Sequence, residues 1–218
     1  KIILYLVELM TRSIYFFYKS ILVQSPRFKE YLVSQGVNKN KIKYYPYYAE
    51  DFYRVVKEKP EIKSLFPKGL NILFAGNIGV SQSFDTIIEA VKIASKKVKR
   101  LNIIVLGDGR DKKRVQEKIY DMGLSNCFRF LGTHPPESMS YFFASSDALL
   151  VTLKKSLIFS LTIPGKLQSY LACGKPIIGS IDGITSDIIN NGKCGYATES
   201  ENYNALATSI IKFDRLSV

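Results

Sequence analysis

The chain has 218 residues, which is enough for one large domain or for one domain with part of a second. Its 46% hydrophobic and 23% charged residues are typical of a folded globular protein and exclude a disordered one. The net charge of +12 favours an anionic partner without choosing among a phosphorylated ligand, a membrane surface and nucleic acid. A single histidine and three cysteines without metal or redox spacing exclude zinc-hydrolase chemistry and a disulfide framework.

The first elements that the sequence predicts form a short group before residue 51. They are a helix at 1–19, a strand at 21–24, a helix at 26–35 and a strand at 41–45. Glu8 and Arg12 interrupt the apolar stripe of the first helix, so it is too polar to span a bilayer. It is interpreted as a packing helix, with an interfacial membrane helix as the alternative. The charged, irregular stretch 52–69 is interpreted as a linker with room for one short helix.

From residue 70 onward, short apolar strands alternate with helices. The strands are expected at 71–75, 101–106, 128–131, 148–153, 176–179 and 195–197, and the helices at 83–97, 110–122, 137–144, 164–174, 183–191 and 201–213. This order predicts an α/β fold, a Rossmann-like parallel sheet with helices on both faces. Ligands of such sheets bind beyond the carboxyl ends of the strands, where the glycine-rich loops of this chain are expected.

The segment 160–179 carries the strongest single signal. Pro164 suits the start of a helix, Gly165 lets a ligand approach the backbone, and Lys166 places a cation beside free N–H groups. This combination predicts an anion site, for which phosphate is the usual occupant. A helix that merely begins with these three residues is the alternative.

Three further loops fall at the same predicted sheet edge. Gly76 and Gly79 permit a tight turn after the first strand, but the loop is neither a dinucleotide fingerprint nor a P-loop. Asp108 either binds a ligand or stabilises its own turn, and His134 either touches a base or sugar or has no role. Because no acid–base pair stands out, the sequence favours a chemistry that needs few protein acids and bases. Transfer from a diphosphate donor is such a chemistry, since the leaving phosphate supplies the base.

The order of four motifs resembles a known family. These motifs are Ala75-Gly-Asn-Ile-Gly79, Leu106-Gly-Asp-Gly109, Phe130-Leu-Gly132 and Pro164-Gly-Lys-Leu-Gln-Ser-Tyr-Leu-Ala-Cys-Gly-Lys-Pro176. Together they are similar to the donor-binding half of retaining GT-B glycosyltransferases of family 4. The resemblance covers about residues 20–213 and implies a remnant of an acceptor-binding N-terminal domain (1–51), a linker (52–69) and a nucleotide-sugar donor domain (70–213).

The resemblance also implies roles for particular residues. Gly79 N–H would hold the donor diphosphate, and Asn77 and Gln82 stand where many members have Arg and Lys for the same group. The other implied donor contacts are Gly109, Gly132 and His134 at the nucleobase, Thr162, Ile163 and Pro164 at the sugar, and Gly76, Gly165, Lys166 and Leu167 N–H at the phosphates. Lys166 would stabilise the charge that develops on the leaving group, which makes it the expected catalytic residue.

Two departures from the family pattern leave two interpretations open. Members commonly carry a sugar-facing and a ribose-clamping glutamate, and Leu161 and Ser169 occupy these positions here. Either the donor site has decayed or it is rearranged, and the second is favoured because Lys166 restores a cation. The run from Phe159 to Pro176 is itself similar to transferases of bacterial O-antigen and capsule assembly, including an N-acetyl-fucosaminyltransferase-like subgroup.

The resemblance therefore implies retaining, metal-independent transfer from a UDP-sugar to a saccharide or lipid-linked saccharide, with no cofactor and no metal. It implies a cytoplasmic location with peripheral contact with an anionic membrane, no nucleic-acid partner and little activity of this chain alone. A non-catalytic nucleotide-sugar-binding module and a nucleotide-sugar epimerase are the alternatives. The epimerase is disfavoured by the lack of a carboxylate pair.

Overall fold

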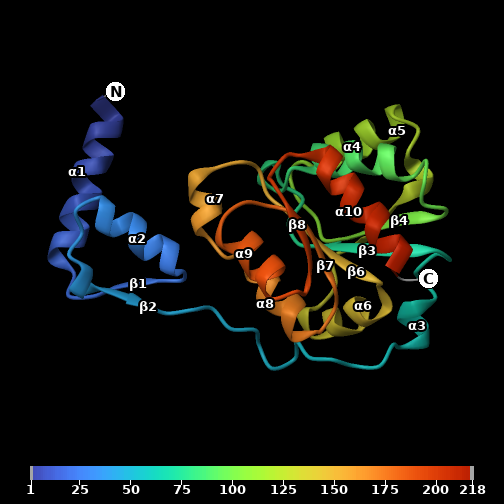
Figure 1. Cartoon of the computed structure of the whole chain (residues 1–218), viewed down its shortest axis with the longest axis horizontal. Helices are drawn as coiled ribbons and strands as arrows, with labels where there is room; N and C mark the ends of the chain where they lie inside the picture. The colour runs from blue at the N-terminus through green and yellow to red at the C-terminus, as the bar shows by residue number, and fades with distance from the viewer. Residues whose placement is uncertain (1, 217–218) are drawn as a thin grey trace.

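The computed structural model describes residues 2–216, which form a small unit and a larger one joined by an extended segment (Figure 1). The small unit contains α1 (Ile2–Phe17), β1 (Ile21–Val23), α2 (Pro26–Ser34), the short 3₁₀ turn η1 (Lys39–Lys41) and β2 (Ile42–Tyr44). Its two strands pair in parallel, and Val23, Leu32 and Ile42 form its core. Ser25 caps α2 by accepting the Phe28 N–H at 3.0 Å, as the sequence predicts.

The larger unit is a six-stranded parallel sheet with helices on both faces, which confirms the predicted fold class. Its strands are β3 (Leu70–Ala75), β4 (Leu101–Leu106), β5 (Phe128–Gly132), β6 (Ala148–Thr152), β7 (Ile177–Ser180) and β8 (Gly195–Thr198). Its helices are α3 (Pro60–Lys63), α4 (Phe84–Ala94), α5 (Lys112–Asp121), α6 (Met139–Ser145), α7 (Leu157–Leu161), α8 (Gly165–Ala172), α9 (Ile184–Asn191) and α10 (Tyr203–Leu216). Three short 3₁₀ turns complete it, η2 (Val80–Gln82), η3 (Ser125–Cys127) and η4 (Pro136–Ser138).

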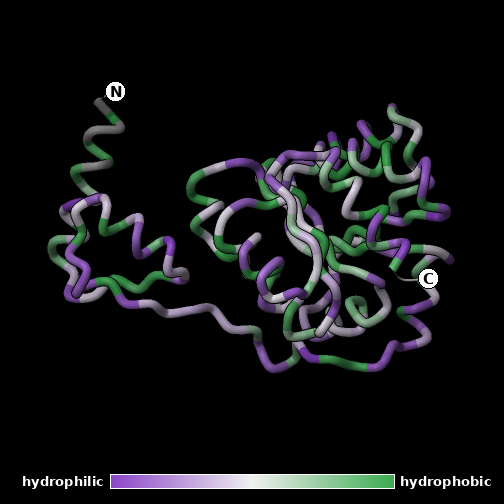
Figure 2. The backbone as a smooth tube through the Cα atoms, in the orientation of Figure 1, coloured by the Kyte–Doolittle hydropathy of each residue, from purple (hydrophilic) through white to green (hydrophobic). Residues whose placement is uncertain are grey.

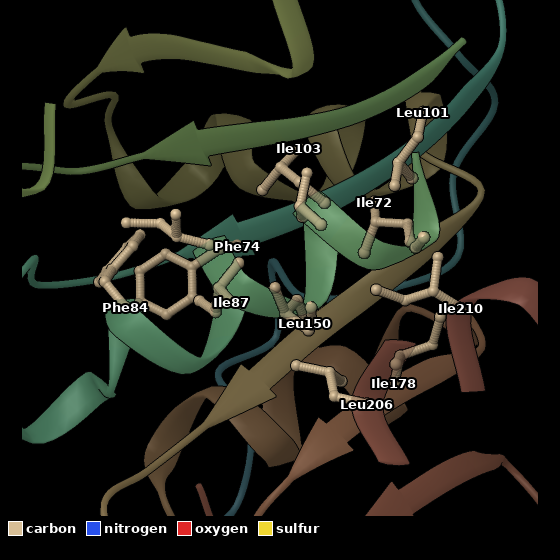
Figure 3. Close-up of a cluster of buried hydrophobic side chains, with 14 of the residues drawn as sticks. Ile72, Phe74, Phe84, Ile87, Leu101, Ile103, Leu150, Ile178, Leu206 and Ile210 are labelled. Carbon is tan, nitrogen blue, oxygen red and sulfur yellow. The ribbon is translucent and has the colours of Figure 1, made fainter. Parts of the chain in front are cut away.

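The central strands form because their apolar runs are buried on both faces. Ile72 and Phe74 point to the face covered by α4 and α10, where they join a cluster with Phe84, Leu206 and others (Figure 3). The intervening residue Leu73 points to the other face, where it packs with side chains of α6 and α8. Figure 2 shows hydrophobic and hydrophilic residues alternating along the helices, as expected of helices that bury one face.

The strand order β5-β4-β3-β6-β7-β8 places a topological switch point between β3 and β6. The chain moves outward from β3 through β4 to β5 and then returns to β6 on the other side of β3. The loops after β3 and β6 therefore leave the sheet in opposite directions and open a crevice at the carboxyl edge. The residues singled out from the sequence lie in the loops at this edge and at the start of α8.

The structure adds one α-helix that the sequence does not predict. Between the strand expected at 148–153 and the helix expected at 164–174, Leu157–Leu161 form the short helix α7. A single apolar turn of five residues is too short for a periodic pattern to reveal. Within the described part of the chain, no helix is both long and apolar enough to cross a bilayer.

Candidate functional site

A cavity of about 740 Å³ opens at the carboxyl edge of the sheet. Its walls come from the loops after β3, β4 and β5, from the first half of α8, and from the segment that joins the two units. Seven of the residues singled out from the sequence line this cavity, namely Gly76, Asn77, Asp108, His134, Gly165, Lys166 and Ser169. The structure thus brings together residues that are up to 93 positions apart in the chain.

Lys166 is the cation of this cavity. Its Nζ donates a hydrogen bond to Gln82 Oε1 at 2.8 Å and lies 3.9 Å from the centroid of the Phe74 ring. The ammonium group also reaches the backbone of Gly76, since a Cβ built on that glycine would lie 3.2 Å from Nζ. Burial lowers the pKa of Lys166 from 10.5 to about 7. A buried ammonium without a paired carboxylate is stabilised by any anion that enters the cavity.

Gln82 holds this ammonium from a fixed position. The Thr152 hydroxyl donates to Gln82 O at 2.6 Å, and the Lys154 N–H donates to Ser81 O at 2.9 Å. These bonds fasten the loop after β3 to the end of β6, across the switch point. The hydrogen bond of Lys166 to Gln82 therefore ties the start of α8 to the same place. Gln82 lies behind the cavity wall and contacts Lys166.

The start of α8 presents two N–H groups that have no partner within the helix, those of Gly165 and Lys166. Pro164 is the residue before the helix, and Gly165 is its first residue. The Leu167 N–H, which was expected to face a phosphate, donates to Pro164 O at 2.9 Å. The Leu167 side chain is fully buried in the core.

The loops after β3 and β4 are packed backbone against backbone. A Cβ on Gly107 would lie 2.0 Å from Gly76 O, and one on Gly109 would lie 2.2 Å from Ile78 O. Gly109 is therefore required for packing, and neither it nor Gly79 lines the cavity. Asn77 Oδ1 lies 2.6 Å from the Cβ position of Gly109, so this side chain covers the turn as well as facing the cavity.

Asp108 and His134 lie at the wall next to these loops. The Asp108 carboxylate accepts a hydrogen bond from the Gly109 N–H at 2.7 Å and one from Lys112 Nζ at 3.0 Å. The hydrogen bond from Lys112 lowers the pKa of the Asp108 carboxyl group. Asp108 thus stabilises its own turn and also lines the cavity. His134 Nε2 is 3.1 Å from Leu131 O, and its ring lies 4.4 Å from Phe142. Gly132 ends β5 behind this wall.

The segment 160–164 lies outside the cavity wall. Ile163 is buried in the core, and Thr162 O accepts the Thr185 hydroxyl at 3.2 Å. Thr162, Ile163 and Pro164, which were expected at the donor sugar, are not among the residues that line the cavity. Leu161 is buried, and its carbonyl accepts the Ser25 hydroxyl, which joins the small unit to this segment.

The sequence did not point to the part of the wall that the connecting segment forms, Tyr47, Tyr48, Glu50 and Tyr53. They lie where the chain passes from β2 to the larger unit. Tyr53 stacks on Phe143 with 6.2 Å between ring centroids and an interplanar angle of 11°. Burial raises the pKa of Tyr53, although a hydrogen bond with Ser169 opposes the rise. The available signal was the density of aromatic residues between 44 and 53.

The parallel sheet, the crevice at its switch point and the lysine that lines it at a helix start define a Rossmann-like domain with a cleft at the carboxyl edge of its sheet. The family model of glycosyl transferases group 1 matches residues 55–215. The chain therefore belongs to this family, and its larger unit matches the C-terminal Rossmann-like domain of GT-B glycosyltransferases.

Known proteins agree with this assignment. The chain is 24% identical over 141 residues to 2-deoxystreptamine N-acetyl-D-glucosaminyltransferase of Niallia circulans, covering 65% of this chain and 35% of the relative. The pneumococcal O-GlcNAc transferase GtfA, solved with UDP and GlcNAc, superposes with a TM-score of 0.72 at 18% identity, over 91% of this chain and 39% of GtfA. Anabaena HepE, solved with UDP and glucose, superposes with a TM-score of 0.69 at 15% identity, over 92% and 58%. The chain spans between about a third and three fifths of these relatives.

Proposed function

We propose that this chain carries the donor site of a retaining glycosyltransferase, which moves a sugar from a UDP-sugar to a saccharide acceptor. The observation that carries the proposal is Lys166, a desolvated lysine that lines the cavity at a helix start, 2.8 Å from Gln82. The family match and relatives solved with UDP support a nucleotide-sugar donor. The diphosphate would lie against Lys166 and the N–H groups of Gly165 and Lys166.

In the proposed reaction the bond between the sugar C1 and the diphosphate oxygen breaks. The acceptor oxygen forms the new bond to C1 on the same face of the sugar, and its proton passes to an oxygen of the leaving diphosphate. The protein supplies no base in this step. Lys166 and the start of α8 stabilise the negative charge of the leaving group, so no metal ion is required for that purpose.

We base the roles of the domains, the acceptor and the location on the family resemblance described above. Residues 1–51 would belong to an acceptor-binding domain, 52–69 to the linker and 70–213 to the donor domain. The acceptor would be a saccharide or a lipid-linked saccharide of bacterial surface polysaccharide synthesis, of the O-antigen or capsule type in family 4. The enzyme would work in the cytoplasm, in peripheral contact with an anionic membrane, and this chain alone would be inactive.

A non-catalytic nucleotide-sugar-binding module is the second candidate. The observation that favours it concerns the two positions where the family commonly has glutamates. Leu161 is buried outside the cavity, and Ser169 lines the cavity but is hydrogen-bonded to Tyr53. The module would bind a UDP-sugar as the transferase does but would release no UDP from it.

The deciding experiment measures UDP release by the complete protein from a panel of UDP-sugars with a saccharide acceptor. We expect turnover with at least one donor, and a loss of 10²–10³ in kcat for Lys166→Met, because Lys166 stabilises the leaving group. Lys175→Met is the matched control, since Lys175 is also partly buried but donates to Ser146 O outside the cavity. Binding of UDP without turnover would establish the module, and full turnover of Lys166→Met would overturn the proposed role of this residue.

A further inference from the structure

Four tyrosines lie close together where the chain passes from the small unit to the larger one. Their exposed fractions are 51% for Tyr44, 57% for Tyr45, 59% for Tyr47 and 78% for Tyr48. Only Tyr47 and Tyr48 of these four line the cavity. Large aromatic side chains at the mouth of a cavity leave apolar area in water, which a bound ligand would cover.

The segment that carries them is fixed at both ends. Before it, Tyr45 N–H donates to Val23 O at 2.8 Å, which continues the β1–β2 pairing. After it, Ser140 Oγ donates to Phe52 O at 2.7 Å, and Tyr53 N–H donates to Glu50 O at 2.9 Å. Residues 46–51 therefore run between two anchored points, along the extended connection in Figure 1.

The chemistry of this wall differs from that of the rest of the cavity. Lys166 and the start of α8 suit phosphate, and Met139 and Phe143 form an apolar wall beside His134. The mouth instead offers two tyrosine rings together with the carboxylate of Glu50. A pyranose has an apolar C–H face that packs on an aromatic ring, and hydroxyl groups that donate to a carboxylate.

We propose that Tyr47, Tyr48 and Glu50 form a pyranose-binding wall, here called the tyrosine wall, at the mouth of the cavity. This inference rests on the proposed function and names the part of the site that contacts sugar. The tyrosines pack on the C–H face of the ring, and Glu50 accepts hydrogen bonds from its hydroxyl groups. The ring belongs either to the donor or to the acceptor. A donor sugar would reach the mouth from the phosphate side, and an acceptor sugar would reach it from solvent.

The test uses saturation-transfer NMR on the complete protein. The donor arm uses UDP-glucose, UDP-galactose and UDP-GlcNAc, and the acceptor arm uses the methyl glycosides of the same three sugars with UDP at saturation. The variants are Tyr47→Ala/Tyr48→Ala and Glu50→Gln, and the matched control is Tyr44→Ala/Tyr45→Ala. Tyr47→Phe/Tyr48→Phe keeps both rings. UDP affinity, measured by calorimetry, reports that each variant is folded.

We expect the signals of the sugar ring to fall at least threefold in Tyr47→Ala/Tyr48→Ala in one of the two arms. That arm identifies whether the sugar belongs to the donor or to the acceptor. UDP affinity should stay within twofold of wild type, and the control and phenylalanine variants should keep the sugar signals. Glu50→Gln should weaken the signals without removing them, since an amide oxygen still accepts a hydrogen bond.

Three results would overturn the tyrosine wall. The first is that Tyr47→Ala/Tyr48→Ala and Tyr44→Ala/Tyr45→Ala give the same sugar signals. The second is that the wild type gives no sugar signal in either arm. The third is that Tyr47→Ala/Tyr48→Ala lowers the affinity for UDP. The last result would assign the tyrosines to the nucleotide. A wild type that binds no UDP is a separate outcome, because it overturns the proposed function and the wall together.

Discussion

Replacing Lys166 by methionine should make the ligand-free protein more stable. Burial lowers the pKa of Lys166 to about 7, whereas in the unfolded chain it lies near 10.5. Between these two values the unfolded state binds one more proton than the folded state, so the stability of the wild type rises with pH. The unfavourable contribution of Lys166 is about 4 kcal/mol at pH 7 and about 2 kcal/mol at pH 9. Methionine has similar length and no charge, and it packs against the Phe74 ring that Lys166 Nζ faces at 3.9 Å.

Urea unfolding at pH 7 and at pH 9 measures this effect directly. The difference in unfolding free energy between Lys166→Met and wild type should be about 2 kcal/mol larger at pH 7 than at pH 9. Taking the difference between the two proteins cancels every other group that titrates in this range. Two results are incompatible with a desolvated ammonium group: a difference that does not change with pH, and a variant that is less stable than the wild type at pH 7. Either result would mean that solvent reaches the ammonium group.

Three further predictions concern the surroundings of the site. Gln82→Ala removes the acceptor of the Lys166 Nζ hydrogen bond, so UDP affinity should fall, but less than in Lys166→Met; an unchanged affinity would show that Gln82 does not position the lysine. Ser25→Ala removes both the cap of α2 and the hydrogen bond to Leu161 O, so urea unfolding should show an unfolding free energy lower by about 1–2 kcal/mol. Arg27→Ala is the control, because it removes only an exposed ion pair with Asp187 and should lower the unfolding free energy by less than about 1 kcal/mol. Equal losses would contradict the difference in burial. Gly107→Ala should prevent soluble expression or lower the melting temperature strongly, because its Cβ would lie 2.0 Å from Gly76 O at a φ of +125°. Gly123→Ala is the control: its Cβ would meet no atom within 4 Å, so its φ of +67° should lower the unfolding free energy by only about 1 kcal/mol.

The sequence predicts the sheet well because its strands are short apolar runs between turn residues. Ile72 to Ala75 and Ile103 to Leu106 are buried on both faces, so hydrophobicity alone marks them. Parallel pairing then places their carboxyl ends at one edge, and this is why glycine loops and Lys166 could be expected in one site.

The wall formed by residues 47–53 was not predicted because its position depends on distant contacts. Phe52 and Tyr53 are held by Ser140 and Phe143, which lie almost 90 residues later, and local sequence carries no signal for such anchoring. The same applies to Leu167, whose N–H is used within the first turn of α8. A glycine in the sequence does not reveal its role, because Gly76 lines the cavity whereas Gly109 is packed between two loops.

Calorimetric titration with UDP at pH 7.0 and pH 8.5 shows whether Lys166 binds the diphosphate of a nucleotide donor. A bound diphosphate favours the charged ammonium, so the wild type should take up a proton on binding and bind UDP roughly tenfold more weakly at pH 8.5. Lys166→Met should bind weakly at both pH values, and Lys175→Met should behave as the wild type. A UDP affinity that is independent of both pH and Lys166 would show that Lys166 does not bind the diphosphate.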